Sequence, residues 1–255
     1  APSPEQLYGI EINEYAHELA QATVWIGYLQ WLHDNGYGVP VEPILKPLDN
    51  IKQMDAILAF DESGNPVEPE WPEVEIIVGN PPFLGNKRMR AELGGGYVDS
   101  LRHLYAGQLP GGVDLVTYWF EKAREMIAEG RAGRAGLIAT QSIRAGASRT
   151  VLDRIKDSGN IFMAWPNREW VQDDAAVRVS MVGFDDNSER EISHDGISVP
   201  EINADLSTSH GDLTRAVRLP ENRGIAYQGP VKVGAFDISS EVADRMLRES
   251  NPSGK

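Results

Sequence analysis

The sequence EVEIIVGNPPF, residues 73–83, joins an apolar run to a rigid loop. The apolar, β-branched residues favour a strand over Glu73–Gly79, and Asn80-Pro81-Pro82-Phe83 follows without a break. Two consecutive prolines fix their own φ angles and remove two N–H donors. The loop therefore presents rigid carbonyl acceptors at the end of a strand.

These acceptors suit the alkylation of an exocyclic amine. The Asn80 side-chain oxygen and the Pro81 carbonyl can together accept both hydrogens of a planar NH₂ group. Such hydrogen bonds favour a pyramidal nitrogen, whose lone pair then leaves conjugation with its ring. Phe83 offers a flat surface on which an extruded base can stack. A purely structural interpretation is also open, in which Pro-Pro ends the strand and Phe83 fills the core.

Strands and helices alternate on both sides of this motif. We expect further strands over residues 7–12, 51–58, 135–140, 160–164 and 177–184. We expect helices over residues 13–36, 114–129, 150–157 and 241–248, and a long loop over 84–113. This order predicts an α/β fold with a mostly parallel sheet. Ligands of such sheets lie at the carboxyl ends of the strands, which singles out Glu11, Asp55 and Asn80.

The first helix has clear end signals and an apolar face. Asn13 is a suitable N-cap, and Gly36 is suited to a left-handed residue at the end. Between them, apolar side chains recur at helical spacing, at Tyr15, Leu19, Ala22, Ile26 and Leu29.

Composition excludes several classes of protein and site. The 255 residues, 41% hydrophobic and 24% charged, fit one sizeable globular domain, or one domain with a small attachment. The absence of cysteine excludes a disulfide framework, a thiolate nucleophile and a cysteine-based zinc site. Five scattered histidines predict no metal site, and no apolar run reaches the roughly 18 residues of a membrane helix. We expect a cytoplasmic location.

The net charge of −14 is unevenly distributed. Residues 1–86 carry two Lys or Arg against fourteen Asp or Glu, whereas residues 87–156 carry twelve against seven. Any contact with a polyanion should therefore involve the middle third of the chain.

The motif IIVGNPPF resembles the catalytic motif of amino-methyltransferases that use S-adenosylmethionine. The wider runs are similar to DNA adenine-N6 methyltransferases: GIEINEYAHELAQATVWIGYLQW, MDAIL, IIVGNPPFLGNK, DLVTYWFEKA and GLIATQSI. The similarity extends to large bacterial restriction–modification enzymes, in which one chain carries methyltransferase and target-recognition parts. It covers roughly residues 7–184 and implies a Rossmann-like class I methyltransferase sheet with flanking helices.

The resemblance implies a role for each matching residue. Glu11 would bind the ribose hydroxyls of S-adenosylmethionine, and Asp55 would accept a hydrogen bond from its adenine amine. Asn80 and Pro81 would hold the N6 amine of the target adenine, and Phe83 would stack on the flipped base. The catalytic set is thus Asn80, Pro81, Pro82 and Phe83. The implied cofactor-binding set is Glu11, Ile12, Asp55, Ala56, Asn80 and Asp114.

Three cations lie just past the motif: Lys87, Arg88 and Arg90. They could contact phosphates of the target DNA strand. They could equally be exposed loop cations with no partner in nucleic acid.

The chain departs from the family at its start. A Gly-rich first motif should precede Glu11 by roughly twenty residues, but ten residues stand there and Ala1–Gln6 contain no glycine. We therefore expect the sheet to lack its first strand, and we interpret Gly94–Gly96 as part of a flexible target-strand loop. Residues 1–186 would form an incomplete catalytic core. Residues 187–255 would form a linker and the start of a target-recognition region, with the remainder of a larger parent chain as a partner.

Methylation of adenine N6 in DNA is the leading hypothesis. It needs no covalent enzyme intermediate, which agrees with the absence of cysteine. Methylation of a protein glutamine or of adenine in RNA would use the same chemistry. A further alternative is a binding fragment that is inactive alone and holds the cofactor weakly.

Overall fold

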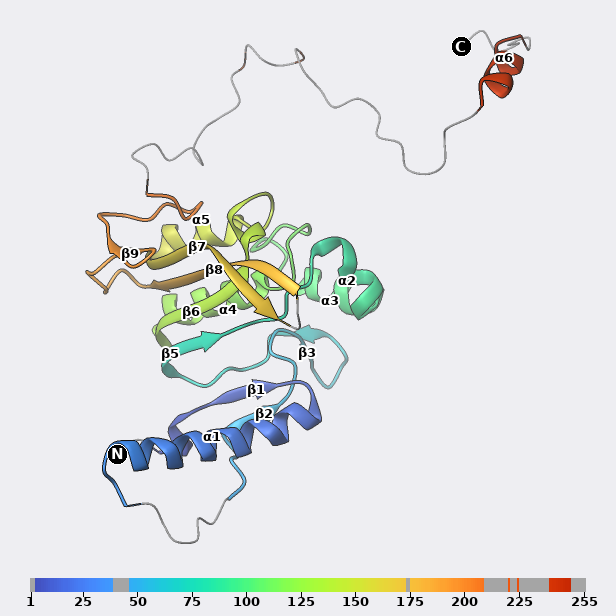
Figure 1. Ribbon diagram of the computed structural model, residues 1–255. Helices are drawn as coiled ribbons and strands as arrows, with labels where there is room; N and C mark the ends of the chain where they lie inside the picture. Colours follow the sequence, from blue (N-terminus) through green and yellow to red (C-terminus); the bar gives the residue numbers. More distant parts are fainter. Residues whose placement is uncertain are drawn as a thin grey trace. The chain divides into compact units, whose positions relative to one another are not determined.

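The computed structural model describes residues 3–38, 46–172, 175–208, 220, 224 and 239–248. The chain divides into two compact units, Ala1–Thr214 and Arg215–Lys255 (Figure 1). Helix α6, Ser240–Arg248, is the described secondary structure of the second unit and matches the last predicted helix. The predicted split at residue 186, between a catalytic core and a recognition region, stays a prediction.

The first unit begins with the 3₁₀ turn η1 (Pro4–Gln6), strand β1 (Gly9–Glu11), helix α1 (Glu14–Asp34) and strand β2 (Ile51–Gln53). Asn13 caps α1 as predicted, because its Oδ1 accepts a hydrogen bond from Ala16 N at 2.9 Å. The predicted left-handed residue is confirmed as well, since Gly36 has a φ of +76°.

Strand β2 is shorter than predicted. It pairs in parallel with β1, with Glu11 opposite Gln53. The strand expected over 51–58 ends early because the Asp55 side chain accepts hydrogen bonds from the backbone of Ile57 and Leu58. Those N–H groups are therefore lost to a strand ladder, and the chain turns.

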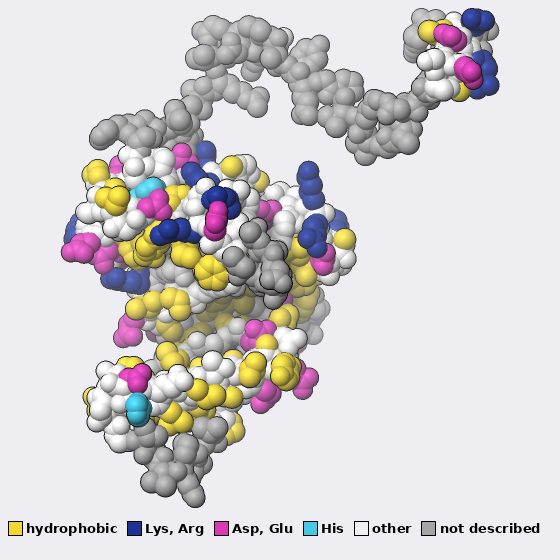
Figure 2. All heavy atoms as spheres, viewed as in Figure 1, with side chains coloured by type: hydrophobic (Ala, Val, Ile, Leu, Met, Phe, Trp, Pro, Cys, Tyr) yellow, Lys and Arg dark blue, Asp and Glu magenta, His cyan; other side chains and the backbone are white. Residues whose placement is uncertain are grey.

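The apolar face predicted for α1 remains largely open among the described residues. Tyr15 is 78% exposed, and Leu19 and Ile26 are each 54% exposed. Hydrophobic side chains accordingly show on the visible face of α1 in Figure 2. The contact of α1 with β2 is partly polar, since His17 Nε2 lies 2.9 Å from the Ile51 carbonyl oxygen.

Two further sheets follow. Strands β3 (Ala59–Phe60) and β4 (Pro66–Val67) form a small antiparallel hairpin. Within the described ranges a six-stranded sheet has the order β10-β9-β7-β8-β6-β5. Its strands are β5 (Val74–Gly79), β6 (Ala132–Thr140), β7 (Asn160–Gln172), β8 (Ala175–Asp185), β9 (Ser193–His194) and β10 (Ile197–Ser198).

This sheet is mixed, so the prediction of a mostly parallel sheet is wrong. The pairs β5–β6 and β7–β9 are parallel, whereas β6–β8, β7–β8 and β9–β10 are antiparallel. Residues 173–174 alone separate β7 from β8, and so short a connection joins antiparallel neighbours. A long helical crossover joins β5 to β6 and allows their parallel pairing.

The segment expected to be a loop over 84–113 contains helices α2 (Asn86–Leu93) and α3 (Gly95–Leu104). The interpretation of Gly94–Gly96 as part of a flexible loop is also wrong. Gly94, with a φ of +84°, separates the two helices, and Gly95 and Gly96 open α3. Met89, Val98 and Leu101 have no exposed surface. Their burial outweighs the poor helix propensity of the glycines.

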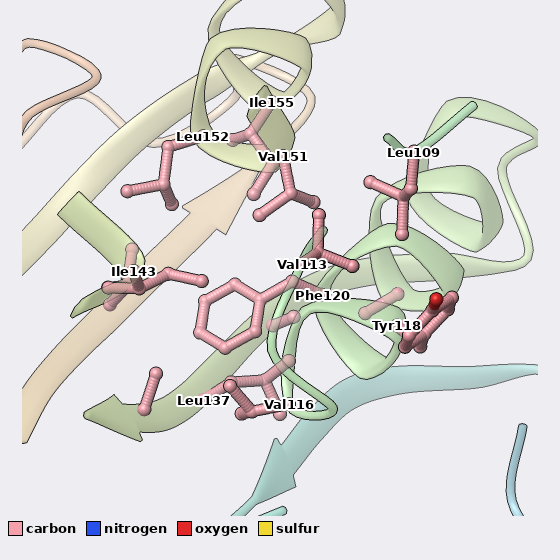
Figure 3. Close-up of a cluster of buried hydrophobic side chains, with 14 of the residues drawn as sticks. Leu109, Val113, Val116, Tyr118, Phe120, Leu137, Ile143, Val151, Leu152 and Ile155 are labelled. Carbon is pink, nitrogen blue, oxygen red and sulfur yellow. The ribbon is translucent and has the colours of Figure 1, made fainter. Parts of the chain in front are cut away.

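Helices α4 (Thr117–Ala128) and α5 (Thr150–Ser158) and the 3₁₀ turn η2 (Gln141–Arg144) complete the core. The Phe120 ring stacks on Phe184 of the sheet, with ring centroids 5.9 Å apart. In Figure 3, Phe120 lies among aliphatic side chains from α5, η2, β6 and the segment just before α4: Val113, Val116, Leu137, Ile143, Val151, Leu152 and Ile155. A tightly packed core of this kind fixes the orientation of the adjoining loops.

The burial of α3 can be tested by truncation. We expect Leu101→Ala to lower the free energy of unfolding by about 2–5 kcal/mol, because it leaves a cavity in the core. The exposed His103 lies on the same helix, and His103→Ala should change that free energy by less than about 0.5 kcal/mol. Urea unfolding measures both. Equal effects would contradict the packing of α3 against the core.

Candidate functional site

The candidate site lies where β5 and β6 end. These strands are parallel, with Gly79 opposite Leu137, so the loops that follow them leave from the same edge of the sheet. A Cβ atom at Gly79 would lie 3.2 Å from Leu137 Cδ2, closer than a neighbouring side chain comfortably allows. Glycine therefore lets the two strands approach at the point where the loop begins.

The loop Asn80–Phe83 contains two prolines, which restrict its backbone, and it carries hydrogen-bond acceptors that a substrate can reach. Asn80 and Pro82 are exposed, Pro81 is buried, and Phe83 is half-buried. Within the described part of the chain, neither the Asn80 side chain nor the Pro81 carbonyl takes part in a hydrogen bond. Both remain available to an outside N–H donor, as the sequence predicts.

Beyond Phe83 the loop is fastened to the start of the α4 segment. Leu115 N donates to the Leu84 carbonyl at 2.9 Å, and Asn86 N donates to Asp114 Oδ1 at 2.8 Å. The guanidinium of Arg102 on α3 donates to Asn86 Oδ1 at 2.7 Å. One end of the loop is thus held by three hydrogen bonds, while its acceptors stay free.

Asp114 joins the loop after β5 to the turn after β6. Its Oδ2 accepts a hydrogen bond from Ser142 Oγ at 2.7 Å, and that hydroxyl also lies 2.6 Å from Thr140 Oγ1. The backbone N–H of Asp114 donates to Ser148 Oγ at 3.0 Å. Both carboxylate oxygens are therefore engaged by the protein, and Asp114 bridges three segments.

Arg102, which the sequence reasoning missed, contacts a second group near the loop. Burial raises the pKa of the Tyr118 hydroxyl, and the nearby Arg102 guanidinium partly offsets this. Three buried polar atoms in this part of the described structure lack a hydrogen-bond partner: Arg102 Nε, Gln108 Oε1 and Thr117 Oγ1. Helical spacing with Val98 and Leu101 could have indicated that Arg102 lies beside the core.

Two further predicted residues, Glu11 and Asp55, meet at the end of the β1–β2 pair. Met54 N donates to the Glu11 carbonyl at 3.1 Å, which places the residue before Asp55 beside the end of β1. Glu11 Oε1 accepts from Asn13 N at 2.8 Å. Ile12 is 65% exposed. The structure thus brings the two carboxylates to one strand end.

Asp55 is held from two sides. Its Oδ1 accepts from Ile57 N at 2.8 Å and from Leu58 N at 3.2 Å. Its Oδ2 accepts from the hydroxyl of Tyr97 on α3 at 2.8 Å. The neighbouring Ala56 carbonyl accepts from Trp71 Nε1 at 2.8 Å. The predicted cofactor end of the site is therefore linked to the segment that follows the loop.

The β1–β2 pair and the six-stranded sheet are separate in the described structure. β5 pairs with β6 on one side, and its other edge has no strand partner among the described residues. On β5, Ile76 is 60% exposed and Val78 is 78% exposed. The expectation that the sheet lacks its first strand stays a prediction, and no hydrogen bond within the described ranges joins Glu11 to the loop.

The three predicted DNA-contacting cations lie on α2 and differ in their partners. Arg88 pairs with Glu92 at 2.6 Å, and Arg90 pairs with Asp99 on α3. Lys87 is exposed and has no ion pair or hydrogen bond with any described residue. Lys87 is therefore the cation on this helix with its charge uncompensated.

The described residues include no group of three or more His, Cys, Asp or Glu side chains that could hold a metal ion. None of the helices in this part of the chain has the length and apolar character that crossing a membrane requires.

Residues 3–194 match the family model of the MmeI DNA-methyltransferase domain. The chain is similar to DNA methyltransferase A of Bacillus subtilis (strain 168), with 27% identity over 194 residues, 70% of this chain and 21% of the relative. Among solved structures it is similar to the Type IIL restriction-modification enzyme MmeI in complex with DNA. That similarity has a TM-score of 0.60 and 24% identity over 81% of this chain and 29% of that one. The chain thus spans about a fifth of the curated relative.

Removal of the Asp114 carboxylate should loosen the site. Asp114→Ala leaves the donors of Asn86 and Ser142 without their acceptor, so we expect the free energy of unfolding to fall by about 1–3 kcal/mol. Asp114→Asn keeps one acceptor oxygen and should cost less. Urea unfolding of both variants provides the measurement. If the Ala variant is as stable as the Asn variant, Asp114 does not fasten the loop.

Proposed function

This chain belongs to the MmeI DNA-methyltransferase domain family, and we propose that it methylates the N6 amine of adenine in DNA within a restriction–modification protein. The methyl donor would be S-adenosylmethionine, and the sheet would be that of a Rossmann-like class I methyltransferase. One observation carries the proposal. A Pro-Pro loop at the carboxyl edge of β5 is fastened at its far end and keeps the acceptors of Asn80 and Pro81 free.

The two acceptors fit a single planar amine. Asn80 Oδ1 and the Pro81 carbonyl would each accept one hydrogen of the adenine N6 amine. This arrangement favours a nitrogen whose lone pair points out of the ring plane, where it can attack a methyl carbon. The half-buried Phe83 would stack on the flipped base, and the buried Pro81 would keep its carbonyl fixed.

The residues present fit the nucleoside part of S-adenosylmethionine. Glu11 keeps Oε2 free for ribose hydroxyls, and Asp55 keeps one acceptor position for a purine amine. The exposed Ile12 and the half-buried Ala56 would flank the purine and ribose. When bound, the cofactor supplies an electrophilic methyl group on a sulfonium sulfur. Asp114 would line the same pocket, and its hydrogen bonds would hold the adjoining loop in place.

The DNA duplex would contact the exposed surface of α2. Lys87, Arg88 and Arg90 are exposed on α2, which begins directly after the loop. Contacts from such side chains to phosphates would position the duplex without reading its sequence. The remainder of the parent chain would supply target recognition.

The role of Asn80 is tested by replacing it. Asn80→Ala removes one of the two acceptors for the target amine, and we expect methylation to be abolished. Single-molecule sequencing of DNA from cells that express the full-length protein would detect N6-methyladenine at a defined motif. Asn65→Ala, at an exposed turn between β3 and β4, is the matched control and should leave methylation intact.

The same experiment separates the alternatives. Near-wild-type methylation by the Asn80→Ala variant would remove the assigned role. Unmodified DNA in cells that contain soluble, cofactor-bound wild-type protein would favour a protein glutamine or an RNA adenine as the substrate.

The cations of α2 should contribute unequally to DNA binding. Because Lys87 is unpaired and Arg88 is paired with Glu92, we expect Lys87→Gln to reduce the slope of log K against log salt by about 1. Arg88→Gln should change that slope less. Fluorescence anisotropy with duplex DNA at several salt concentrations measures the slope. A larger effect at Arg88 than at Lys87 would contradict the proposed contact.

A further inference from the structure

The turn that follows β2 is fixed by side chains of α3 and of the residue that caps it, in a distant part of the sequence. Tyr97 of α3 donates to Asp55 Oδ2 at 2.8 Å. Tyr105, the residue directly after α3, donates to the Ile57 carbonyl at 3.4 Å. Tyr97 thus contacts the carboxylate itself, whereas Tyr105 contacts only the backbone beside it.

The hydrogen bonds of Asp55 leave one acceptor position open. Each carboxylate oxygen can accept two hydrogen bonds. Oδ1 accepts from the backbone N–H groups of Ile57 and Leu58 and is saturated. Oδ2 accepts from Tyr97 alone among the described residues. A single further N–H donor can therefore be accommodated, and the Tyr97 hydroxyl fixes the direction from which it must come.

Tyr97 is the donor in its contact with Asp55. Burial raises the pKa of its hydroxyl, and the hydrogen bond and negative charge of Asp55 raise it further. The phenol therefore stays protonated throughout the physiological range and gives its one hydrogen to Asp55. This bond helps to fix the rotation of the carboxylate about its Cβ–Cγ bond.

We propose that Tyr97 is a positioning residue that aims Asp55 Oδ2 at the exocyclic amine of the cofactor purine and so selects a 6-aminopurine. The proposal rests on the proposed function, in which Asp55 binds that amine. It adds a residue of α3, downstream of the catalytic loop, to the determinants of cofactor binding.

The experiment compares two ligands on the full-length protein by isothermal titration calorimetry. One is S-adenosylhomocysteine, and the other is its analogue with hydrogen in place of the purine 6-amino group. Tyr97→Phe removes the hydroxyl and keeps the ring. We expect it to weaken S-adenosylhomocysteine binding by about tenfold, the effect of one charge-assisted hydrogen bond, and to leave the analogue unchanged.

Two further variants complete the test. Tyr105→Phe removes a buried hydroxyl from the residue directly after α3 and should leave the ratio of the two affinities at the wild-type value. In an Asp55→Ala background, Tyr97→Phe should cause no additional loss, because the group through which it acts is gone.

The outcomes separate this inference from the proposed function. Suppose that the wild-type protein binds S-adenosylhomocysteine, but Tyr97→Phe lowers the affinity for both ligands equally or for neither. The positioning role of Tyr97 is then overturned, and the proposed function stands. If the wild-type protein does not prefer the amino ligand, Asp55 does not bind the amine, and the cofactor-binding role of Asp55 and the positioning role of Tyr97 fall together.

Discussion

The parallel pairing of β5 with β6 is the constraint on which the site depends. It brings the loop after Gly79 and the turn after Thr140 to one edge of the sheet. The Asp114 carboxylate then closes the arrangement, because one oxygen accepts from Asn86 N and the other from Ser142 Oγ. Without the parallel register these two donors would leave the sheet at opposite ends, and one side chain could not accept from both.

The resulting loop is asymmetric in a way that suits catalysis. Its far end is tied through Leu84 and Asn86 to α3 and the start of α4, whereas Asn80 and Pro81 retain free acceptors. Rigid support from outside the reacting groups lowers the reorganisation needed when a substrate arrives. The prolines contribute to the same end, because they remove donors that would otherwise compete for these oxygens.

Features with a local cause could be predicted from the sequence. Asn13 and Gly36 mark the ends of α1 through their own side-chain and backbone chemistry. The strand before the loop follows from an apolar run and two prolines. Helices α2 and α3 could not be predicted in this way, since burial of Val98 and Leu101 in the core overrides the glycine triplet. The reversal of chain direction between β7 and β8 could not be predicted either, because only residues 173–174 connect the two strands.

The residues of the candidate site can be divided in the same way, into those with a local sequence signal and those that depend on distant contacts. The motif identified Asn80, Pro81 and Phe83, and strand ends identified Glu11 and Asp55. Asp114 was also predicted, but its role in fastening the loop and the contacts of Ser142 and Tyr97 could not be, because the partners in each contact are remote in sequence. Asp114 and Ser142 are 28 residues apart, and Asp55 and Tyr97 are 42 apart. No pattern in one sequence reports such a pair.

The edge of β5 that has no strand partner among the described residues affects how copies of this polypeptide can associate. Its backbone N–H and C=O groups, flanked by the exposed Ile76 and Val78, form a template to which any extended segment can add. Copies of the chain would be kept apart mainly by like charge, since residues 1–86 carry a strong excess of Asp and Glu, two of them at Glu73 and Glu75. Salt screens that repulsion but not backbone hydrogen bonding. High ionic strength would therefore favour edge-to-edge pairing between copies of the folded molecule.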